Sequence, residues 1–409
     1  MTTVELTTTS IAVGGEAVAR EESGRVVFVA GALGGERVVA DVFDERRSFA
    51  RAVTVSVIDA SPDRVAPPCP HVSAGCGGCD WQHVAPSAQR ALRRDLVVEV
   101  LARAKGISDP QVELGPALEA ERIRTVVRGT VGPDGRFAFR RRRSHDPVEV
   151  DSCLVAHPLV EQIITEGRFG SAREVMVRVG ARTGERLVLV DPTASGVQVP
   201  DDVVVVGARQ LAGGHRAWIH EEAAGRVWRI SAGSFFQASP EGAEALVDVV
   251  SAYVAELAPS AERLVDLCCG VGLFAGTVGS GLTVTGVERG ASAVADARHN
   301  LADVDGRIVK VALSRWRPAR ADVVVADPAR AGLGREGVAA VAATGAGLCV
   351  LVSCDPASLG RDSSLLAAQG FEHVRSTVLD VFGHTSHIEV VSAFRRLDGS
   401  SHPPGPSAP

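Results

Sequence analysis

Residues 264–275 read LVDLCCGVGLFA, an apolar strand-like run that leads through a glycine-rich turn into a helix-like stretch. Further apolar runs follow at TVTGVE (283–288), DVVVADP (322–328) and LCVLVSC (348–354), with helix-like stretches between them. Strands that alternate with helices predict a doubly wound α/β sheet, here over residues 231–397. Ligands of such sheets bind at the carboxyl ends of the strands, so the residues that follow each strand are the candidates for a site.

The glycine-rich turn predicts a nucleotide-like ligand. Gly270 and Gly272 let the backbone approach a ligand closely, and Glu288 ends the next strand, where a carboxylate can bind two ribose hydroxyls. The turn lacks the third glycine of a dinucleotide fingerprint, and Asp266 before it would repel a pyrophosphate. A ligand with a cationic centre and a ribose fits better, and S-adenosylmethionine is one. An ordinary βα turn with a strand-end acid would carry the same pattern.

A thiol follows another strand of the predicted sheet. Cys354 comes one strand beyond Asp327, so both side chains should open onto the same crevice. A thiol beside a methyl donor suggests covalent catalysis at a pyrimidine, in which a thiolate adds to C6 and makes C5 nucleophilic. A base must then remove the C5 proton, and His384, His387 and Glu389 are the candidates. The alternative for Cys354 alone is a small buried hydrophobic residue.

A glycine-rich loop carries thiols with the spacing C-x6-C-x2-C, at Cys69, Cys76 and Cys79. This spacing predicts a metal site, because three thiolates in a flexible loop can fold around an ion or a cluster. On spacing alone zinc ranks above an iron–sulfur cluster. The fourth ligand would be His71, His83 or Cys153, which is the only other cysteine before the predicted α/β sheet.

Composition and charge narrow the class of protein. The chain has 409 residues, of which 45% are hydrophobic, enough for two or three domains. It has neither a long apolar span nor a signal-like N-terminus, so we expect a soluble cytoplasmic monomer. The net charge is −6, but residues 121–143 hold eight arginines against two acids, and such a stripe can bind phosphates on a protein that is acidic overall. In an extended strand, Arg140 and Arg142 would share one face and Arg141 and Arg143 the other.

The chain divides into three expected domains and a tail. Residues 1–62 read as short strands with turn glycines and predict a small closed β-barrel. Residues 63–230 hold the cysteine loop, a helix near 85–106 and a strand-rich region with a hairpin around 133–135. The α/β sheet occupies 231–397, and residues 398–409 are expected to be disordered.

These motifs together resemble the RNA uracil-C5 methyltransferase family, the bacterial enzymes that make 5-methyluridine in 23S rRNA or tRNA. The resemblance covers nearly the whole chain and rests on CPHVSAGCGGC (69–79), FFQ (235–237), DLCCGVG (266–272), DPAR (327–330), SCDPASLGRD (353–362) and HTSHIEVV (384–391). It implies a C-terminal Rossmann-like class I methyltransferase domain, an N-terminal TRAM/OB-like RNA-binding barrel and a central β-rich domain with a cluster.

The resemblance also implies roles for individual residues. The nucleophile falls on Cys354 and the proton-abstracting base on Glu389. The expected S-adenosylmethionine site comprises Gln237, Asp266, Cys268, Gly270, Gly272, Glu288 and Asp327. The implied [4Fe–4S] ligands are Cys69, Cys76, Cys79 and Cys153, in place of zinc. Alternatives are an RNA-binding iron–sulfur protein with weak or lost catalysis, and a methyltransferase that acts on another RNA position.

The chain departs from the family pattern at several positions beside these residues, namely Cys268, Leu273, Ala329 and Asp355. Asp355 stands where the family usually has Asn, directly after Cys354. An anion beside a thiol raises the pKa of the thiol, so we expect Asp355 to lower the thiolate fraction of Cys354.

Overall fold

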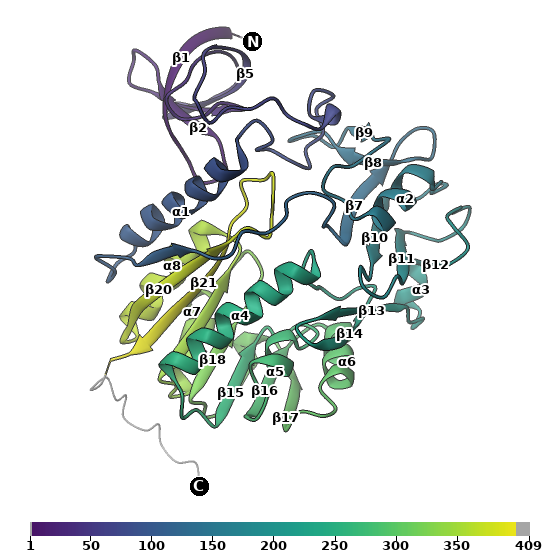
Figure 1. Cartoon of the computed structure of the whole chain (residues 1–409), viewed down its shortest axis with the longest axis vertical. Helices are drawn as coiled ribbons and strands as arrows, with labels where there is room; N and C mark the ends of the chain where they lie inside the picture. The colour runs from purple at the N-terminus through teal and green to yellow at the C-terminus, as the bar shows by residue number, and fades with distance from the viewer. Residues whose placement is uncertain (1, 398–409) are drawn as a thin grey trace.

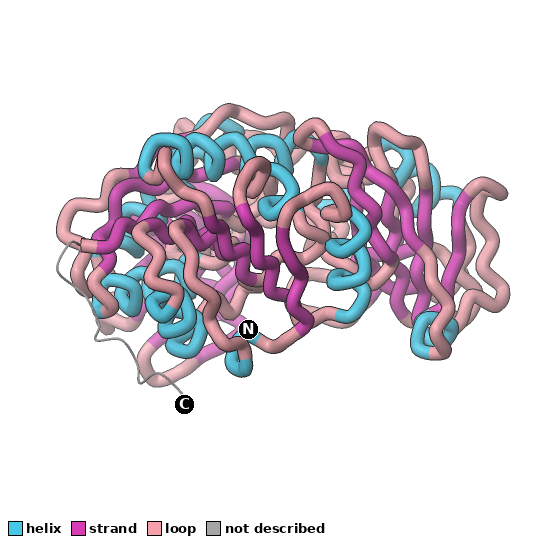
Figure 2. The backbone as a smooth tube through the Cα atoms, turned by 90° about the horizontal axis from the view of Figure 1, so that it is seen from below, coloured by secondary structure: helices cyan, strands magenta, loops and turns pink. Residues whose placement is uncertain are grey.

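The computed structural model describes residues 2–397, so the expected disordered tail at 398–409 lies outside the described residues. Figure 1 shows a barrel at the top, a central sheet on the right and a larger C-terminal sheet below. Seen from below in Figure 2, the two sheets lie toward opposite ends of an elongated molecule. Among residues 2–397, none of the helices combines the length and the apolar character that crossing a membrane requires.

The N-terminal strands form the closed barrel that the sequence predicts, in the order β1-β2-β3-β5-β4. Its strands are β1 (Thr2–Ile11), β2 (Ala17–Arg20), β3 (Val26–Ala30), β4 (Arg37–Glu45) and β5 (Phe49–Asp59). Small and β-branched side chains alternate inward along them, so that Ala17, Ala19, Val27 and Val29 are fully buried. These side chains fill the narrow interior, so a molecule that binds the barrel would contact its outer face.

The segment after the barrel carries the cysteine loop into α1 (Pro86–Ala102), through the short helix η1 (Pro70–Val72). Pro86 starts α1, at a position where proline's missing N–H costs no helical bond. Val97 and Leu101 of α1 are buried in the same apolar cluster as Leu359 and Leu366 of the C-terminal part. In Figure 1, α1 accordingly lies between the barrel and the C-terminal sheet.

The central sheet has six strands in the order β12-β11-β10-β7-β8-β9. Its strands are β7 (Val126–Val131), β8 (Phe137–Arg140), β9 (Pro147–Glu149), β10 (Glu174–Val179), β11 (Arg186–Asp191) and β12 (Val203–Gly207). The helices α2 (Pro158–Glu166) and α3 (Ala208–Ala212) and the hairpin β13 (Trp218–Ala223) and β14 (Arg226–Ser231) accompany them. The antiparallel pair of β7 and β8 confirms the predicted hairpin around residues 133–135.

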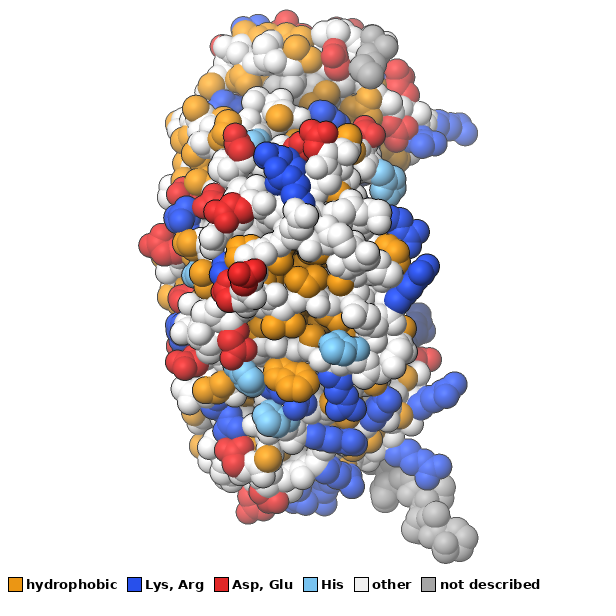
Figure 3. All heavy atoms as spheres, turned by 90° about the vertical axis from the view of Figure 1, so that its right-hand side faces the viewer, with side chains coloured by type: hydrophobic (Ala, Val, Ile, Leu, Met, Phe, Trp, Pro, Cys, Tyr) orange, Lys and Arg blue, Asp and Glu red, His pale blue; other side chains and the backbone are white. Residues whose placement is uncertain are grey.

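The predicted alternation of the arginines after this hairpin is wrong. Strand β8 ends at Arg140, and the following residues form a turn in which Arg143 has a φ of 57°. Three of the four side chains lie against acids: Arg140 against Glu174, Arg142 against Asp80 and Arg143 against Glu16. Figure 3 views the molecule from the side of the central sheet and shows both basic and acidic side chains on this face, with the basic ones gathered mainly toward the right and the lower part of the view.

The C-terminal sheet confirms the predicted α/β architecture and has the order β17-β16-β15-β18-β19-β21-β20-β6. The strands are β6 (Val112–Leu114), β15 (Arg263–Leu267), β16 (Thr283–Glu288), β17 (Gly306–Lys310), β18 (Val323–Ala326), β19 (Leu348–Ser353), β20 (Phe371–Leu379) and β21 (Glu389–Arg396). The first five in this order are parallel, and β21 is antiparallel to both of its neighbours.

Helices cover both faces of this sheet. They are α4 (Pro240–Leu257), α5 (Leu273–Thr277), α6 (Ala291–Asn300), η2 (Leu313–Arg315), α7 (Gly334–Ala343) and α8 (Pro356–Ala368). Val323 and Val325 of β18 pack into the cluster that contains α4, whereas Val324 packs into the cluster that contains α7 and α8. A strand buried on both faces needs apolar residues at every position, which explains its continuous apolar sequence.

Candidate active site and cysteine cavity

The candidate nucleophile and the candidate base face each other at the carboxyl edge of the C-terminal sheet. Cys354 directly follows β19, and Glu389 is the first residue of β21. The antiparallel register pairs Ser353 with Val390, so one further step sets Cys354 opposite Glu389. Asp327 follows the neighbouring parallel strand β18, and its charge acts on both groups. The structure thus brings together three residues that the sequence places far apart.

This edge of the sheet, where a parallel sheet is expected to bind its ligand in a crevice, is rich in buried carboxyl groups. Burial raises the pKa of Asp327 to about 7. Burial and the charge of Asp327 hold the pKa of Glu389 well above its usual range. The pKa of Asp266, which is fully buried, also lies well above its usual range because of burial and the nearby Asp327 and Glu288. Such a crevice favours either bound protons or a cationic ligand.

The surroundings of Cys354 favour the protonated form of its thiol. Its pKa is raised to about 11, first by burial and then by the charges of Glu389 and Asp327, while Arg330 acts in the opposite direction. The Asp355 carboxylate is turned toward α8, where it accepts a hydrogen bond of 2.7 Å from the backbone N–H of Ser358. Asp355 therefore serves as the N-cap of α8, a role that the Asp-Pro pair at the start of a helix could have signalled.

The glycine-rich turn leaves room for a ligand. Cys268, Gly270 and Gly272 all have positive φ angles, of 63°, 55° and 99°. A Cβ atom added at Gly270 would meet nothing within 4 Å, so the space beside this backbone is open. Glu288 is fixed at this turn, because its Oε2 accepts from the N–H of Gly270 at 3.2 Å and its Oε1 from that of Gly290 at 2.6 Å.

Asp266 adds an unsatisfied acceptor at the same place. Its Oδ2 accepts from the N–H of Ala275 at 2.9 Å, whereas its Oδ1 is buried without a hydrogen-bond partner. A buried carboxylate oxygen without a partner is costly. The open backbone, this free acceptor and the negative charge of the crevice fit a ligand that is cationic and donates hydrogen bonds, as S-adenosylmethionine does.

The FFQ segment lies between β14 and α4. Gln237 and Phe236 are buried, and Phe236 packs against Trp228 with ring centroids 6.4 Å apart. Phe235 is 66% exposed, which is unusual for so large an apolar side chain. The exposed ring is the kind of surface on which a base can stack.

The two histidines considered as bases lie on the β20–β21 connection. His384 is buried, with its ring 3.7 Å from the carboxylate of Glu121. His387 lies 3.4 Å from the guanidinium of Arg330. Burial lowers the pKa of both rings. Of the three candidate bases, Glu389 is the one whose charge acts on the Cys354 thiol.

The four cysteines of the predicted metal site line one cavity of about 210 Å³, although Cys153 is separated from the other three by more than seventy residues. Within residues 2–397, no group of three or more His, Cys, Asp or Glu side chains is arranged to hold a metal ion. His71 also lines this cavity. His83 does not line it and lies near Arg64 and Glu36. Metal binding by the four thiols therefore stays a prediction.

A cation lies beside these thiols. The guanidinium of Arg124 lines the cavity, and its Nη2 is enclosed without a hydrogen-bond partner. Burial raises the pKa of Cys79 to about 11, while the charge of Arg124 acts to lower it. A buried guanidinium with one nitrogen that lacks a hydrogen-bond partner, beside four thiol groups, fits an occupant that keeps the sulfur atoms anionic. Nothing in the sequence around Arg124 signalled this placement.

No protein-family model matches the chain. It is 36% identical to an RNA methyltransferase of Streptomyces avermitilis, over 93% of this chain and 95% of the relative. It is 32% identical to the 23S rRNA (uracil(1939)-C(5))-methyltransferase RlmD of Halomonas elongata, over 98% of this chain and 92% of the relative. Among solved structures, the Pyrococcus abyssi tRNA (uracil-54, C5)-methyltransferase in complex with S-adenosyl-L-homocysteine superposes with a TM-score of 0.72. That match covers 95% of this chain and 99% of the other at 22% identity, and it shows a shared fold.

The fold and these similarities define the chain as an RNA methyltransferase. More narrowly, it belongs to the RNA uracil-C5 methyltransferase family, as the sequence motifs predict.

Proposed function

We propose that this enzyme transfers a methyl group from S-adenosylmethionine to C5 of a uridine in 23S rRNA or tRNA, through a covalent bond between Cys354 and C6 of the uracil. The observation that carries the proposal is the placement of Cys354 opposite Glu389, at the sheet edge that also bears the glycine-rich turn. The names of the relatives support the substrate class and leave the RNA and the target uridine open.

The chemistry assigns a separate task to each of the two residues. The thiol of Cys354 loses its proton to water, the thiolate adds to C6, and the electron pair of the C5–C6 double bond moves toward O4, which makes C5 a nucleophile. S-adenosylmethionine, when bound, supplies an electrophilic methyl group to C5. Glu389 then takes the proton from C5, the electron pair of that C–H bond restores the double bond, and Cys354 leaves as a thiolate.

The residues proposed to hold S-adenosylmethionine surround the glycine-rich turn and are Gln237, Asp266, Cys268, Gly270, Gly272, Glu288 and Asp327. Glu288 would accept hydrogen bonds from the ribose hydroxyls, because its carboxylate is fixed at the turn by backbone N–H groups. Burial raises the pKa of Asp266 and Asp327, and a bound cation would favour their ionised forms, so the two carboxyl groups favour a cationic ligand there.

We further propose that Cys69, Cys76, Cys79 and Cys153 hold a [4Fe–4S] cluster. The single cavity that they line and the enclosed guanidinium of Arg124 support this assignment. Such a cluster would tie the cysteine loop covalently to the central sheet through Cys153. The guanidinium of Arg124 would offset its negative charge.

The barrel is proposed to be a TRAM-like RNA-binding domain at residues 1–62, followed by a cysteine-bearing central domain at 63–230 and the methyltransferase domain at 231–397. The position of α1 and β6 refines this division, because both pack on the C-terminal sheet. RNA phosphates would meet the arginines of the central sheet that have no ion pair within the described residues, among them Arg128 and Arg141. We expect the enzyme to act as a cytoplasmic monomer.

Release of tritium from RNA labelled at C5 of uracil tests the function. A uridine-C5 methyltransferase must remove this hydrogen, so wild-type enzyme should release tritium into water in step with methyl transfer from S-adenosylmethionine. Methylation without tritium release would indicate another RNA position. Tight RNA binding without methyl transfer or tritium release would indicate an RNA-binding protein that has lost catalysis.

A further inference from the structure

The connection between β20 and β21, residues 380–388, carries the chain into Glu389. It contains no helix or strand, and His384 in its middle has a φ of 61°, an uncommon angle for a residue other than glycine. Backbone groups of a buried loop need hydrogen-bond partners, because an unpaired buried group costs about as much as a lost hydrogen bond. The hydrogen-bond partners of this loop therefore fix the position at which the chain reaches Glu389.

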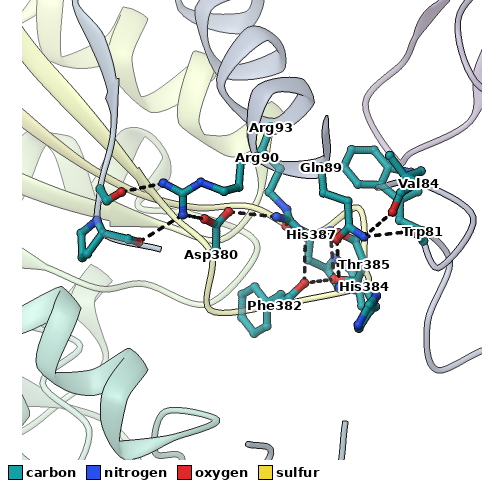
Figure 4. A network of polar contacts seen from close by, with 12 residues as sticks. Trp81, Val84, Gln89, Arg90, Arg93, Asp380, Phe382, His384, Thr385 and His387 are labelled. Atoms are coloured by element: carbon teal, nitrogen blue, oxygen red, sulfur yellow. Dashed lines mark hydrogen bonds and ion pairs between the residues drawn. The ribbon is translucent and has the colours of Figure 1, made fainter. Parts of the chain in front are cut away.

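One set of partners comes from α1. The side chain of Arg93 is almost fully buried, and its guanidinium spans the loop (Figure 4). Its Nε donates to the carbonyl of His387 at 3.1 Å, and its Nη2 donates to the carbonyls of Phe382 at 3.1 Å and Thr385 at 2.7 Å. Its Nη1 lies 2.9 Å from the carboxylate of Asp380, at the start of the loop. One planar group thus fixes the loop at four points.

A second set of partners comes from the cysteine loop. Asp80, directly after Cys79, accepts from the backbone N–H of Ser386 at 2.8 Å and from its hydroxyl at 2.6 Å. The N–H of Trp81 donates to the carbonyl of His384 at 3.0 Å. The loop before Glu389 is therefore held from two sides by residues that precede it by about three hundred positions.

We propose that Arg93 and Asp80 are positioning residues for Glu389: they set the geometry of residues 380–388 and so the rate at which Glu389 removes the C5 proton. The inference rests on the proposed function, because it assigns a step to Glu389. A general base must lie within hydrogen-bond reach of its proton, and a displacement of about 1 Å can cost roughly a hundredfold in rate. Formation of the Cys354 adduct and binding of RNA do not require this geometry.

The chain offers a matched control on the same helix. Arg90 also forms an ion pair with Asp380, but its other hydrogen bonds go to the carbonyls of Gly115 and Pro116, away from the loop. Replacing Arg90 removes a cation from α1 and an ion pair from Asp380 while the three loop carbonyls keep Arg93. The difference in kcat between the Arg93 variant and the Arg90 variant therefore measures the effect of the hydrogen bonds from Arg93 to the three loop carbonyls.

The experiment compares Arg93→Gln, Asp80→Ala and Arg90→Gln, purified without oxygen and assayed on ordinary uridine RNA. For Arg93→Gln and Asp80→Ala we expect kcat to fall by about ten- to a hundredfold with KM within about threefold. A covalent protein–RNA species that survives SDS should accumulate in both, because proton removal has become slow. Arg90→Gln should keep kcat within about threefold of wild type and accumulate no such species.

Two results would overturn the inference: equal losses in Arg93→Gln and Arg90→Gln, or a loss of kcat without accumulation of the covalent species. If Arg93→Gln does not fold, Asp80→Ala decides alone, and wild-type kcat in that variant counts against the proposal. Failure of the proposed function is recognised separately, since wild type itself would then form no adduct with RNA that carries 5-fluorouridine at the target.

Discussion

The thiol of Cys354 and the four thiols of the cysteine cavity are all partly or fully buried, and they differ in the charges around them. Burial raises the pKa of Cys354 to about 11, and it does the same to Cys79. Beside Cys354 the nearest charges are carboxylates, which raise the pKa further. Beside Cys79, a hydrogen bond with Gln82 and the positive charge of Arg124 lower the pKa, whereas the neighbouring thiols Cys153 and Cys76 raise it. We infer that neighbouring charge distinguishes the two sites. The carboxyl groups suit Cys354 to react when a cationic ligand binds, whereas Arg124 suits the cavity thiols to a permanently anionic state.

The largest effect that this comparison predicts is at the crevice. Cys354→Ala should abolish methylation, because no other described thiol faces Glu389, while S-adenosylmethionine binds with an affinity within a few-fold of wild type. The checks are methyl transfer to RNA, calorimetric binding of S-adenosylmethionine, and an SDS-stable adduct with 5-fluorouridine RNA in wild type alone. Near wild-type turnover by Cys354→Ala would show that Cys354 is not the nucleophile.

A smaller effect is expected at the carboxyl group opposite the thiol. Glu389→Gln should still form the Cys354 adduct and methylate C5, and then stall, since loss of a general base costs roughly 10²–10⁴ in rate. Gel analysis of protein and ordinary uridine RNA should show an accumulating covalent species. A rate loss below about threefold without that species would reassign the base to His387 or His384.

The third prediction tests whether the crevice thiol responds to a cation. Below a pKa of about 11 the thiolate fraction rises about tenfold per pH unit, so alkylation of Cys354 by iodoacetamide should accelerate accordingly between pH 7 and 10. Sinefungin, an analogue with an amine cation in place of the sulfonium, should speed alkylation by about tenfold or more relative to S-adenosylhomocysteine, whose thioether sulfur carries no charge.

A matched variant sharpens this test. Asp355→Asn removes a negative charge from the residue next to Cys354 and keeps a good N-cap for α8. Since Asp355 is turned toward the helix, the alkylation rate should change by less than about threefold. A large acceleration would show that Asp355 sets the thiol pKa, as the sequence alone led us to expect. Equal alkylation rates with sinefungin and with S-adenosylhomocysteine would show that the pKa of the Cys354 thiol does not respond to the charge of the bound ligand.

The smallest effect concerns the cysteine cavity. Anaerobically purified protein should hold about four irons per chain, and Cys79→Ser should hold less than about one, because a cubane needs its thiolate ligands. Cys268→Ser, at a thiol outside the cavity, should retain the iron and serves as the control. Metal analysis and the visible absorption spectrum give the answer. Stoichiometric zinc without iron would restore the interpretation that rests on spacing alone.

The sequence predicted the positions of Asp327, Cys354 and Glu389 because each follows or begins a strand whose apolar pattern is strong. The sequence-based prediction failed after Arg140, where the expected strand is a turn. The backbone of Arg141 pairs there with Cys76 of the cysteine loop, a contact that the sequence does not signal. Strand β6 has three residues, too few for any periodicity to register. The partners of residues 380–388 could not be predicted, since a hydrogen bond between Arg93 and His387 leaves no trace in local sequence.

The place of β6 at the outer edge of the C-terminal sheet has a consequence for synthesis. Glu113 of β6 accepts a hydrogen bond from Thr377 of β20, a residue 264 positions later. At about 5–20 residues per second, a ribosome needs roughly 13 to 50 seconds to make that interval. The barrel can close early from neighbouring strands and can cover Ala88 and Leu96 of α1. Val97 and Leu101 of α1 and the edge of β6 must wait for the C-terminal elements. The nascent chain is therefore most in need of a chaperone during the interval before β20 emerges.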